Sequence, residues 1–346
     1  MTRYGSALVV GILWFFLIAC GQSADRPRPQ QEEKIKIGLL MDTLQEERWQ
    51  RDRDLFVERV RQMRAEVLVE SAERDDARQL QQAQSMLEQG VKALVVVPHN
   101  VEAAARIVEA AKQRGVPVIA YDRLIRNADL DLYISYDNRR IGEMQAQYLR
   151  NRAPKGNYIL LGGAKTDYNA ILIREGQLEA LEDAIKGGDI RVAADPWTPD
   201  WQADAARELT AAALKRARNQ VVAVVASNDT TAGGAIKALE EQGLAGRVLV
   251  SGQDANLDAV RRIVQGTQAM TVYKPLRALA PLAATYAVQM ATGVKVEGTS
   301  TIDGGTKKVQ AFLLNPISVD KRLIDLVIIK DKFHTREQVY GSGGSK

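Results

Sequence analysis

Charged and amide side chains follow several short apolar runs of this chain, where they could hold a ligand by hydrogen bonds. The first clear case is the apolar run 118–121, which Asp122 and Arg123 follow directly. The groups with this placement are Asp122-Arg123, Ser227-Asn228-Asp229, Gln253-Asp254-Ala255-Asn256 and Tyr273-Lys274. A carboxylate accepts hydrogen bonds, an amide donates and accepts them, and arginine and lysine only donate. This mixture suits a neutral polyhydroxylated ligand, because each hydroxyl group needs both a donor and an acceptor.

Other residue types widen the choice of ligand. Trp49 and Trp201 could supply flat apolar faces for the C–H side of a sugar ring, although an isolated tryptophan more often packs in a core. The candidate acids are Asp122 and Asp254, whereas the candidate cations are Arg48, Arg123, Arg174 and Lys274. This excess of cations would also permit an acidic ligand. Charge alone therefore leaves neutral and acidic sugars open. At residues 122–123 taken alone, a solvated loop is as reasonable as a binding site.

The chain lacks the short motifs that mark common catalytic and cofactor sites. It contains no Gly-x-Gly-x-x-Gly after a strand, no P-loop, no Gly-x-Ser-x-Gly and no His-Glu-x-x-His. With only His99, His334 and the single Cys20, neither a histidine-rich metal site nor an internal disulfide is possible. The 43 acidic residues leave a paired-carboxylate hydrolase open by count, but nothing marks two of them as a pair.

Alternating strand-like and helical runs must position the polar groups. The strand-like runs are 35–40, 67–70, 93–97 and 118–121, and after a restart 157–161, 192–194, 221–226 and 248–251. The helical runs between them are 49–64, 76–89 and 101–114, then 169–186, 202–217, 230–242 and 256–264. This alternation predicts an α/β fold with two similar lobes, each a parallel sheet flanked by helices. Such sheets bind ligands beyond the carboxyl ends of their strands, where the polar groups stand.

Bulk properties agree with a globular protein of more than one core. The 346 residues exceed the usual size of a single domain. Apolar residues make up 46% and charged residues 26%, with a net charge of +4. Basic and acidic residues are interleaved and form no basic block, which argues against a nucleic-acid partner.

The beginning of the chain is typical of an export signal. Arg3 precedes an apolar stretch at 7–18 that is too short to span a bilayer comfortably. The stretch ends in Leu17-Ile18-Ala19-Cys20, which resembles the bacterial lipoprotein box, so we expect lipidation of Cys20. The alternative is a plain cleaved signal with a chance cysteine. The polar, proline-containing residues 21–33 predict a flexible tether.

Several segments, in the same order along the chain, resemble the D-xylose-binding proteins of bacterial sugar ABC transporters, a branch of the type I periplasmic binding proteins. They are Glu47-Arg48-Trp49-Gln50, Ala120-Tyr121-Asp122-Arg123, Tyr133-Ile134-Ser135-Tyr136-Asp137-Asn138, 225–234, Ser251-Gly252-Gln253-Asp254-Ala255 and Thr271-Val272-Tyr273-Lys274-Pro275. The resemblance covers about residues 34–334. It implies two lobes joined by a three-segment hinge, which close on D-xylose and deliver it to an ABC permease. It also implies a binding protein with no cofactor, and not an enzyme.

The resemblance also implies which residues hold the sugar in the cleft between the lobes. Together with Trp49, the expected ligand-binding residues are Arg48, Asp122, Arg123, Asn169, Arg174, Trp201, Asn228, Asp254 and Lys274. Tyr168 departs from the family, in which a second asparagine is expected beside Asn169. The retained acids, amides and cations argue against a switch to an anionic sugar.

Domain boundaries follow from the pattern and the resemblance together. The expected parts are 1–20 as signal peptide with lipobox, 21–33 as tether, 34–137 plus 275–302 as the first lobe, 138–274 plus 303–334 as the second lobe, and 335–346 as a flexible tail. The hinge would cross between the lobes near 135–138, 274 and 303.

We expect a monomer in the periplasm or at the cell surface, held to the membrane through lipidated Cys20. Its partners would be D-xylose or a similar monosaccharide and an ABC transporter permease. Ribose, arabinose or glucose is the alternative ligand. The alternative function is a sugar sensor that docks on a chemoreceptor or a histidine kinase.

Overall fold

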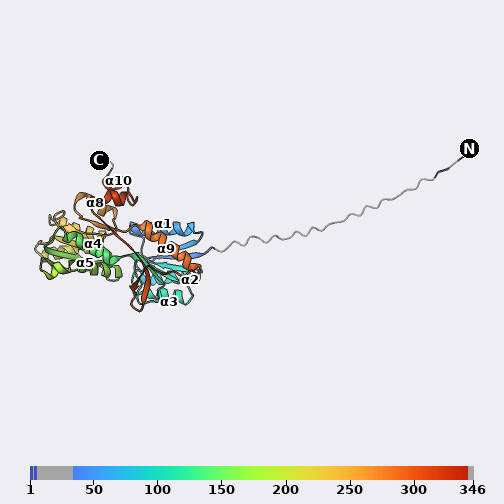
Figure 1. Cartoon of the computed structure of the whole chain (residues 1–346), viewed down its shortest axis with the longest axis horizontal. Helices are drawn as coiled ribbons and strands as arrows, with labels where there is room; N and C mark the ends of the chain where they lie inside the picture. Colours follow the sequence, from blue (N-terminus) through green and yellow to red (C-terminus); the bar gives the residue numbers. More distant parts are fainter. Residues whose placement is uncertain (3, 6–33, 342–346) are drawn as a thin grey trace. The chain divides into compact units, whose positions relative to one another are not determined.

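The computed structural model describes residues 1, 2, 4, 5 and 34–341. Cys20, the apolar stretch before it and the expected tether lie outside these residues. Residues 34–341 form two α/β lobes (Figure 1), each with its own sheet. The α/β class with parallel sheets flanked by helices, predicted from the alternating runs, is confirmed.

The first lobe is built on a seven-stranded sheet. In spatial order its strands are β11 (Ser300–Asp303), β12 (Lys308–Leu314), β5 (Leu132–Tyr136), β4 (Val118–Tyr121), β3 (Ala93–Val96), β1 (Lys36–Met41) and β2 (Glu66–Ser71). All neighbours pair in parallel except β11, which is antiparallel to β12. The central strands are buried on both faces, which explains their continuous apolar sequence.

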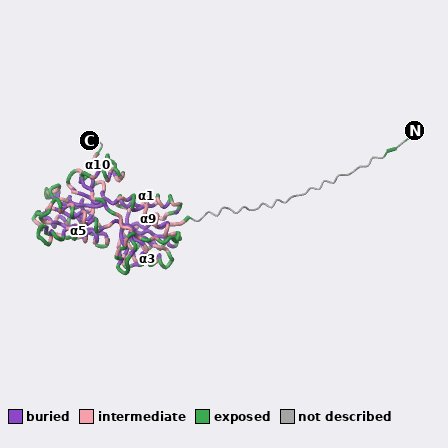
Figure 2. The backbone as a smooth tube through the Cα atoms, viewed as in Figure 1, coloured by how far each residue is buried: buried purple, intermediate pink, exposed green. Residues whose placement is uncertain are grey.

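Four helices cover the two faces of this sheet. On one face lie α1 (Glu47–Gln62) and α9 (Leu276–Ala291), and on the other lie α2 (Asp76–Glu88) and α3 (Ala105–Lys112). Each face has its own apolar core. Buried residues accordingly occupy the middle of the lobe (Figure 2). The helix α1 turns Phe56 and Val60 into the core while its N-terminal residues face the second lobe.

The second lobe repeats this arrangement on a smaller scale. Its parallel strands, in spatial order, are β7 (Ile190–Ala194), β6 (Gly156–Leu161), β8 (Ala223–Ala226) and β9 (Leu249–Val250). The helices are α4 (Asn138–Arg150) and α5 (Tyr168–Lys186) on one face, α6 (Ala203–Arg216) and α7 (Asp229–Glu240) on the other, with α8 (Leu257–Gln265) following β9. Several of these helices begin at a side-chain cap, for example Asn228, which lies just beyond β8 and caps α7.

The chain crosses between the lobes three times. It passes from β5 into α4, from β10 (Thr271–Tyr273) into α9, and from β12 into β13 (Ile317–Val319), which pairs with β10. The third crossing was expected near 303 and lies instead between Leu314 and Ile317. The expectation was wrong because β12 extends the first sheet beside β5 and buries Val309 and Ala311 there.

The end of the chain also differs from the expected tail. A short π-helix (Ile324–Ile329) and α10 (Arg336–Tyr340) follow β13. Thr335 and Gln338 form a capping box at the start of α10, and Val339 is buried against the core below α8. Residues 335–341 therefore belong to the second lobe, and 342–346 lie outside the described residues.

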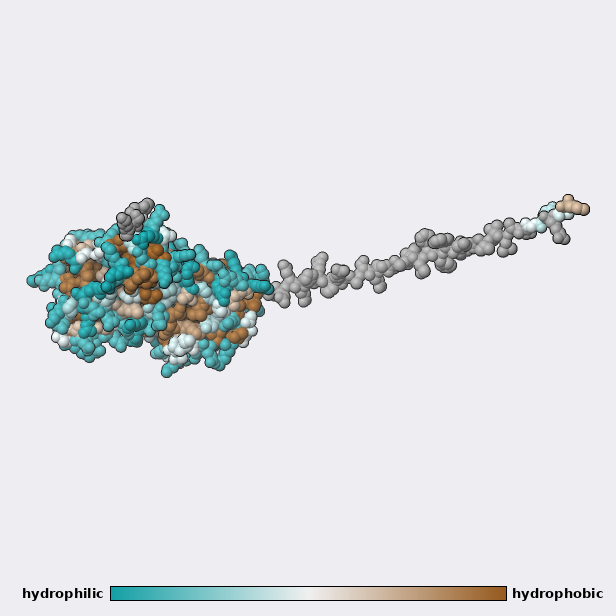
Figure 3. Space-filling model, turned by 45° about the horizontal axis from the view of Figure 1, so that its top comes forward, coloured by the Kyte–Doolittle hydropathy of each residue, from teal (hydrophilic) through white to brown (hydrophobic). Residues whose placement is uncertain are grey.

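The surface seen in Figure 3 is mostly hydrophilic, with hydrophobic residues in separate patches. Within residues 34–341, no helix has both the length and the hydrophobicity that crossing a bilayer requires.

Candidate functional site

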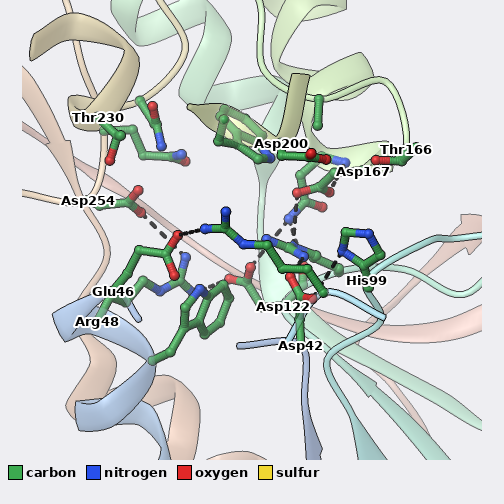
Figure 4. Close-up of a pocket in the computed structure, with 18 of the residues that line it drawn as sticks. Asp42, Glu46, Arg48, His99, Asp122, Thr166, Asp167, Asp200, Thr230 and Asp254 are labelled. Atoms are coloured by element: carbon green, nitrogen blue, oxygen red, sulfur yellow. Dashed lines mark hydrogen bonds and ion pairs between the residues drawn. The ribbon is translucent and has the colours of Figure 1, made fainter. Parts of the chain in front are cut away.

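A polar cavity of about 70 Å³ lies between the two lobes (Figure 4). A buried water needs roughly 10–15 Å³ of cavity volume measured in this way, so the cavity has room for about five waters. This size suits one small ligand and not a chain of sugar units. The residues that line it are Asp42, Glu46, Arg48, Trp49, Arg74, His99, Asp122, Arg123, Ala164, Thr166, Asp167, Asn169, Asp200, Trp201, Asn228, Thr230, Gln253, Asp254, Asn256 and Lys274.

Backbone strain accompanies the residues at the strand ends. Asp122 follows β4 with φ 62° and Asp254 follows β9 with φ 96°, so both adopt the left-handed region. Asp200 and Trp201, on the short 3-10 helix at Pro199–Trp201, also have positive φ, at 47° and 58°. Such conformations cost about 1–3 kcal/mol each and persist where surrounding contacts hold them, often at functional sites.

Two acids and two cations from both lobes meet at the base of the cavity. The guanidinium of Arg48, on α1, makes a close ion pair with Asp122 and lies 3.4 Å from Asp254 Oδ1. Lys274 Nζ lies 2.8 Å from Asp254 Oδ1 and 3.9 Å from Asp122 Oδ1. Burial alone would raise the pKa of Asp122, but Arg48 and Lys274 outweigh it and lower that pKa to about 2. Asp122 is therefore a charged acceptor at neutral pH.

A second charged group surrounds Arg123. Its guanidinium lies 2.6 Å from Asp42 Oδ2 in the first lobe and 2.9 Å from Asp167 Oδ2 in the second lobe. His99 Nδ1 approaches the other oxygen of Asp42 at 3.1 Å, and this hydrogen bond raises the pKa of His99. Arg123 thus connects the lobes and keeps part of its donor capacity at the cavity wall.

Amide side chains complete the polar lining. Asn169, in the first turn of α5, donates from Nδ2 to the backbone carbonyl of Asp122 at 3.0 Å. Its Oδ1 accepts from Asn138 at 3.0 Å, so Asn169 is fixed on both sides. Asn228 caps α7 by accepting from the backbone N–H of Thr231 at 2.9 Å. Both amides therefore have a structural role as well as a face toward the cavity.

Two tryptophans form the apolar part of the lining. Trp49 is 5% exposed. The centre of its ring lies 4.3 Å from Cζ of Arg48 and 5.4 Å from Cζ of Arg123, so both guanidinium groups lie over the ring. Trp201 comes from the second lobe, where its ring lies so close to Gly163 that a Cβ there would overlap it. Trp49 thus combines the core packing expected of an isolated tryptophan with a position at the cavity.

The structure brings nine of the ten expected residues to the cavity. The tenth, Arg174, lies behind the wall, where it pairs with Asp195 and stacks on Trp197 at 5.1 Å. Burial lowers the pKa of Arg174 to about 10. Tyr168, the departure from the family pattern, packs under Arg126 at 4.6 Å and is not part of the lining. Tyr168 therefore belongs to the surroundings of the cavity and not to its wall.

Eleven lining residues were not among the ten. Gln253 and Asn256 belong to a strand-end group already visible in the sequence, and Asp42 and His99 follow β1 and β3 closely. Applying the strand-end rule to every strand would have found these four. The other seven lie in loops, at helix caps or in short or first helical turns without a comparable signal, and are Glu46, Arg74, Ala164, Thr166, Asp167, Asp200 and Thr230.

The donors and acceptors of this cavity suit binding more than bond breaking. Within the described residues, no group of three or more His, Cys, Asp or Glu side chains could hold a metal ion. Each acid at the base of the cavity already pairs with a cation. The arrangement can hold a neutral polyhydroxylated molecule through many hydrogen bonds.

Comparison with known proteins agrees with this geometry. Residues 37–295 match the model of a periplasmic binding protein domain. The chain belongs to the periplasmic binding protein family. Within that family it is 49% identical over 306 residues to the D-xylose-binding periplasmic protein of Haemophilus influenzae, covering 88% of this chain and 92% of that protein. It is 45% identical over 307 residues to the protein of the same name from Escherichia coli, covering 89% and 93%.

Solved structures of periplasmic binding proteins share the fold. A carbohydrate transporter solute-binding protein from Chloroflexus aurantiacus, in complex with D-glucose, superposes with a TM-score of 0.83 at 28% identity. The match covers 88% of this chain and 98% of that chain. The names of these relatives describe binding proteins and not enzymes. The predicted membership of the type I periplasmic binding proteins is confirmed.

Proposed function

We propose that this protein captures D-xylose in the cavity between its lobes and delivers the sugar to an ABC permease. The observation that carries the proposal is the ring of charge-paired donors and acceptors contributed by both lobes. Hydrogen bonds that involve a charged group contribute about 1.5–3 kcal/mol each, and an acid beside a cation matches neighbouring hydroxyl groups. The identity to two D-xylose-binding periplasmic proteins supports the choice of sugar.

The proposed contacts are the nine expected residues at the cavity, with Arg174 as a support outside the lining. The lobes would close on the sugar by a hinge motion through the three crossings, as two-lobe receptors do. Closure then presents one joint surface of both lobes to the permease. The protein would act as a monomer, because each chain carries a whole cavity.

A thermal-shift panel of D-xylose, ribose, arabinose and glucose tests the proposal. A ligand at about 100 times its dissociation constant adds roughly 2.7 kcal/mol to the free energy of unfolding. We expect the largest shift with D-xylose. Glucose is the competitor to watch, because the Chloroflexus aurantiacus relative is in complex with D-glucose. A larger shift with another sugar would contradict xylose as the ligand and leave the fold untouched.

The partner of the closed form is tested separately. We propose the permease, and a pull-down from membranes with and without D-xylose distinguishes it from a chemoreceptor or a sensor kinase. Recovery of permease subunits only with sugar supports delivery. Recovery of a receptor instead supports the sensing function.

We also propose that the protein works outside the cytoplasm and is held to the membrane through a lipid on Cys20. The lipobox-like residues before Cys20 support this proposal. The several acyl chains of a lipoprotein cysteine would anchor firmly, whereas a single chain anchors only marginally. The mature protein should partition into the detergent phase, and Cys20→Ala should move it to the aqueous phase. Equal partitioning of both forms would refute the anchor.

A further inference from the structure

Asp52 is a buried acid of α1 that lies just behind the cavity. Its side chain is 1% exposed, and it is absent from the cavity lining. It stands one helical turn after Arg48, so both side chains project from the same face of α1. Asp52 Oδ2 accepts from Arg48 Nε at 3.2 Å, and Oδ1 makes a close hydrogen bond with the hydroxyl of Tyr121 on β4.

The Arg48 guanidinium makes three hydrogen bonds, two toward the cavity and one behind it. Its terminal nitrogens point to Asp122 and Asp254, which both line the cavity. Its Nε points away from the cavity to Asp52. A guanidinium is a planar group with donors in fixed directions, so an anchor at Nε sets where the terminal nitrogens can reach. The contact to Asp254, at 3.4 Å, is too long to set that orientation alone.

We propose that Asp52 is a positioning residue for sugar binding, which holds the Arg48 guanidinium at the angle that the sugar requires. The inference rests on the proposed function, because its readout is D-xylose affinity. Tyr121 is part of the same device, since its hydroxyl fixes the second oxygen of Asp52. Because β4 also carries Asp122 at its end, one strand aligns the acid in the cavity and the support behind it.

The charge on Asp52 predicts a specific pH dependence of sugar affinity. Burial raises its pKa to about 6 against the opposing effects of Arg48 and Tyr121. The titratable groups facing it are Arg48 on α1, Tyr121 and Asp122 at β4, Tyr136 on β5 and Lys274 beyond β10. As the pH falls through about 6, Asp52 takes up a proton and Arg48 loses its anchor. Sugar affinity should therefore fall with acidification.

The test compares Asp52→Asn with wild type by calorimetric titration with D-xylose at pH 7.5 and pH 5. At pH 7.5 we expect Asp52→Asn to bind about tenfold more weakly, the size of a typical coupling between contacting residues. Wild type should weaken between pH 7.5 and pH 5 by more than the variant does. His99, whose pKa is also raised, is present in both proteins, so the difference between them reports Asp52. Asp54→Asn, on the same helix with a 68% exposed side chain, should match wild type.

A second variant keeps the inference testable if Asp52→Asn fails to fold. Tyr121→Phe retains the carboxylate and removes the hydrogen bond that lowers its pKa. The pH at which affinity begins to fall should therefore move upward. If both variants bind D-xylose with the affinity and the pH profile of wild type, the inference is overturned. Binding of D-xylose by wild type would still support the proposed function. Failure of wild type to bind D-xylose would instead overturn the proposed function.

Discussion

Asp254 is the cavity acid whose removal should harm binding most selectively. It is the nearest counter-charge of the 3% exposed Lys274, whose next acid, Asp122, is 3.9 Å away. Asp254→Ala removes an acceptor for the sugar and leaves a buried cation with one distant partner. We expect D-xylose affinity to fall ten- to a hundredfold, where each factor of ten is about 1.4 kcal/mol.

Calorimetry measures this loss directly. The matched control is Asp258→Ala, four residues later, where the side chain is 81% exposed and pairs with Arg261 at 3.7 Å. The control should bind like wild type. Unchanged affinity in Asp254→Ala would remove Asp254 from the site.

Asp229 supplies a pH-dependent contribution to stability. It is buried, and it accepts from Gln268 Nε2 at 2.8 Å and from the backbone N–H of Asn256 at 3.0 Å, which secures the loop that carries Asp254. Burial raises its pKa to about 7, from 3.8 in the unfolded chain. A raised pKa means that the folded protein binds the proton more tightly. The stabilisation is therefore complete below about pH 4 and is lost as the pH rises through about 7.

Asp229→Asn tests this sign. The melting temperature of wild type without sugar should fall between pH 5.5 and pH 8, and the fall should be smaller in the variant. Asp52 and His99, whose pKa values are also raised, act in the same direction and leave a remaining slope. His334, with a lowered pKa, acts in the opposite direction. Asp258→Asn is the exposed control and should keep the wild-type slope. An identical slope in Asp229→Asn would contradict the assignment.

At the scale of elements, α4 and α5 pack closely because of two glycines. A Cβ at Gly176 would overlap the backbone carbonyl of Arg139, and one at Gly142 would overlap that of Ile173. Each helix thus approaches the backbone of the other. Gly176→Ala should lower the free energy of unfolding by about 1–3 kcal/mol or more, as overpacking does.

Urea unfolding followed by circular dichroism measures this change. Gly233→Ala on α7 is the control, because its Cβ would meet only the end of the Arg262 side chain, at 3.3 Å, and no backbone atom. Alanine is the better helix former, which offsets this close approach, so the control should lose much less stability than Gly176→Ala. Equal stability of both variants would show that α4 and α5 can move apart without cost.

Most strands and helices of the two lobes were predictable, whereas the helices α4, α9 and α10 and the C-terminal strands were not. The run 118–121 became β4 with the same bounds, because apolar β-branched residues before a charged pair carry a strong signal. The helix α9 contains Pro281, and proline is unusual inside a helix. Its sequence is also rich in Ala and Leu throughout, so apolar and polar residues do not alternate with the helical period. The helix α4 begins at the Asp137 cap, within the segment interpreted only as a crossing.

For the whole molecule, the cavity depends on contacts that no local pattern contains. Arg48 and Asp254 lie 206 positions apart and meet only because the lobes face each other. The positions of strand ends supplied only separate candidate residues. The resemblance to a known family was needed to group them into one site. Arg174 shows the limit of this transfer, since a matching motif fixes a residue's place in the chain, whereas the structure pairs Arg174 with Asp195 outside the cavity lining.

Contacts between the lobes explain how one sugar could hold both. Arg48 bridges to Asp254, Arg123 bridges to Asp167, and Asn169 donates to the backbone of Asp122. A sugar in the cavity would add hydrogen bonds to the same side chains, so its binding free energy favours the closed arrangement of the lobes.

Calorimetric titration of the wild-type protein with D-xylose tests the central claim most directly. The account predicts one sugar per chain and a lower dissociation constant for D-xylose than for ribose, arabinose or glucose. Absence of binding, or tighter binding of one of the other three sugars, would contradict it.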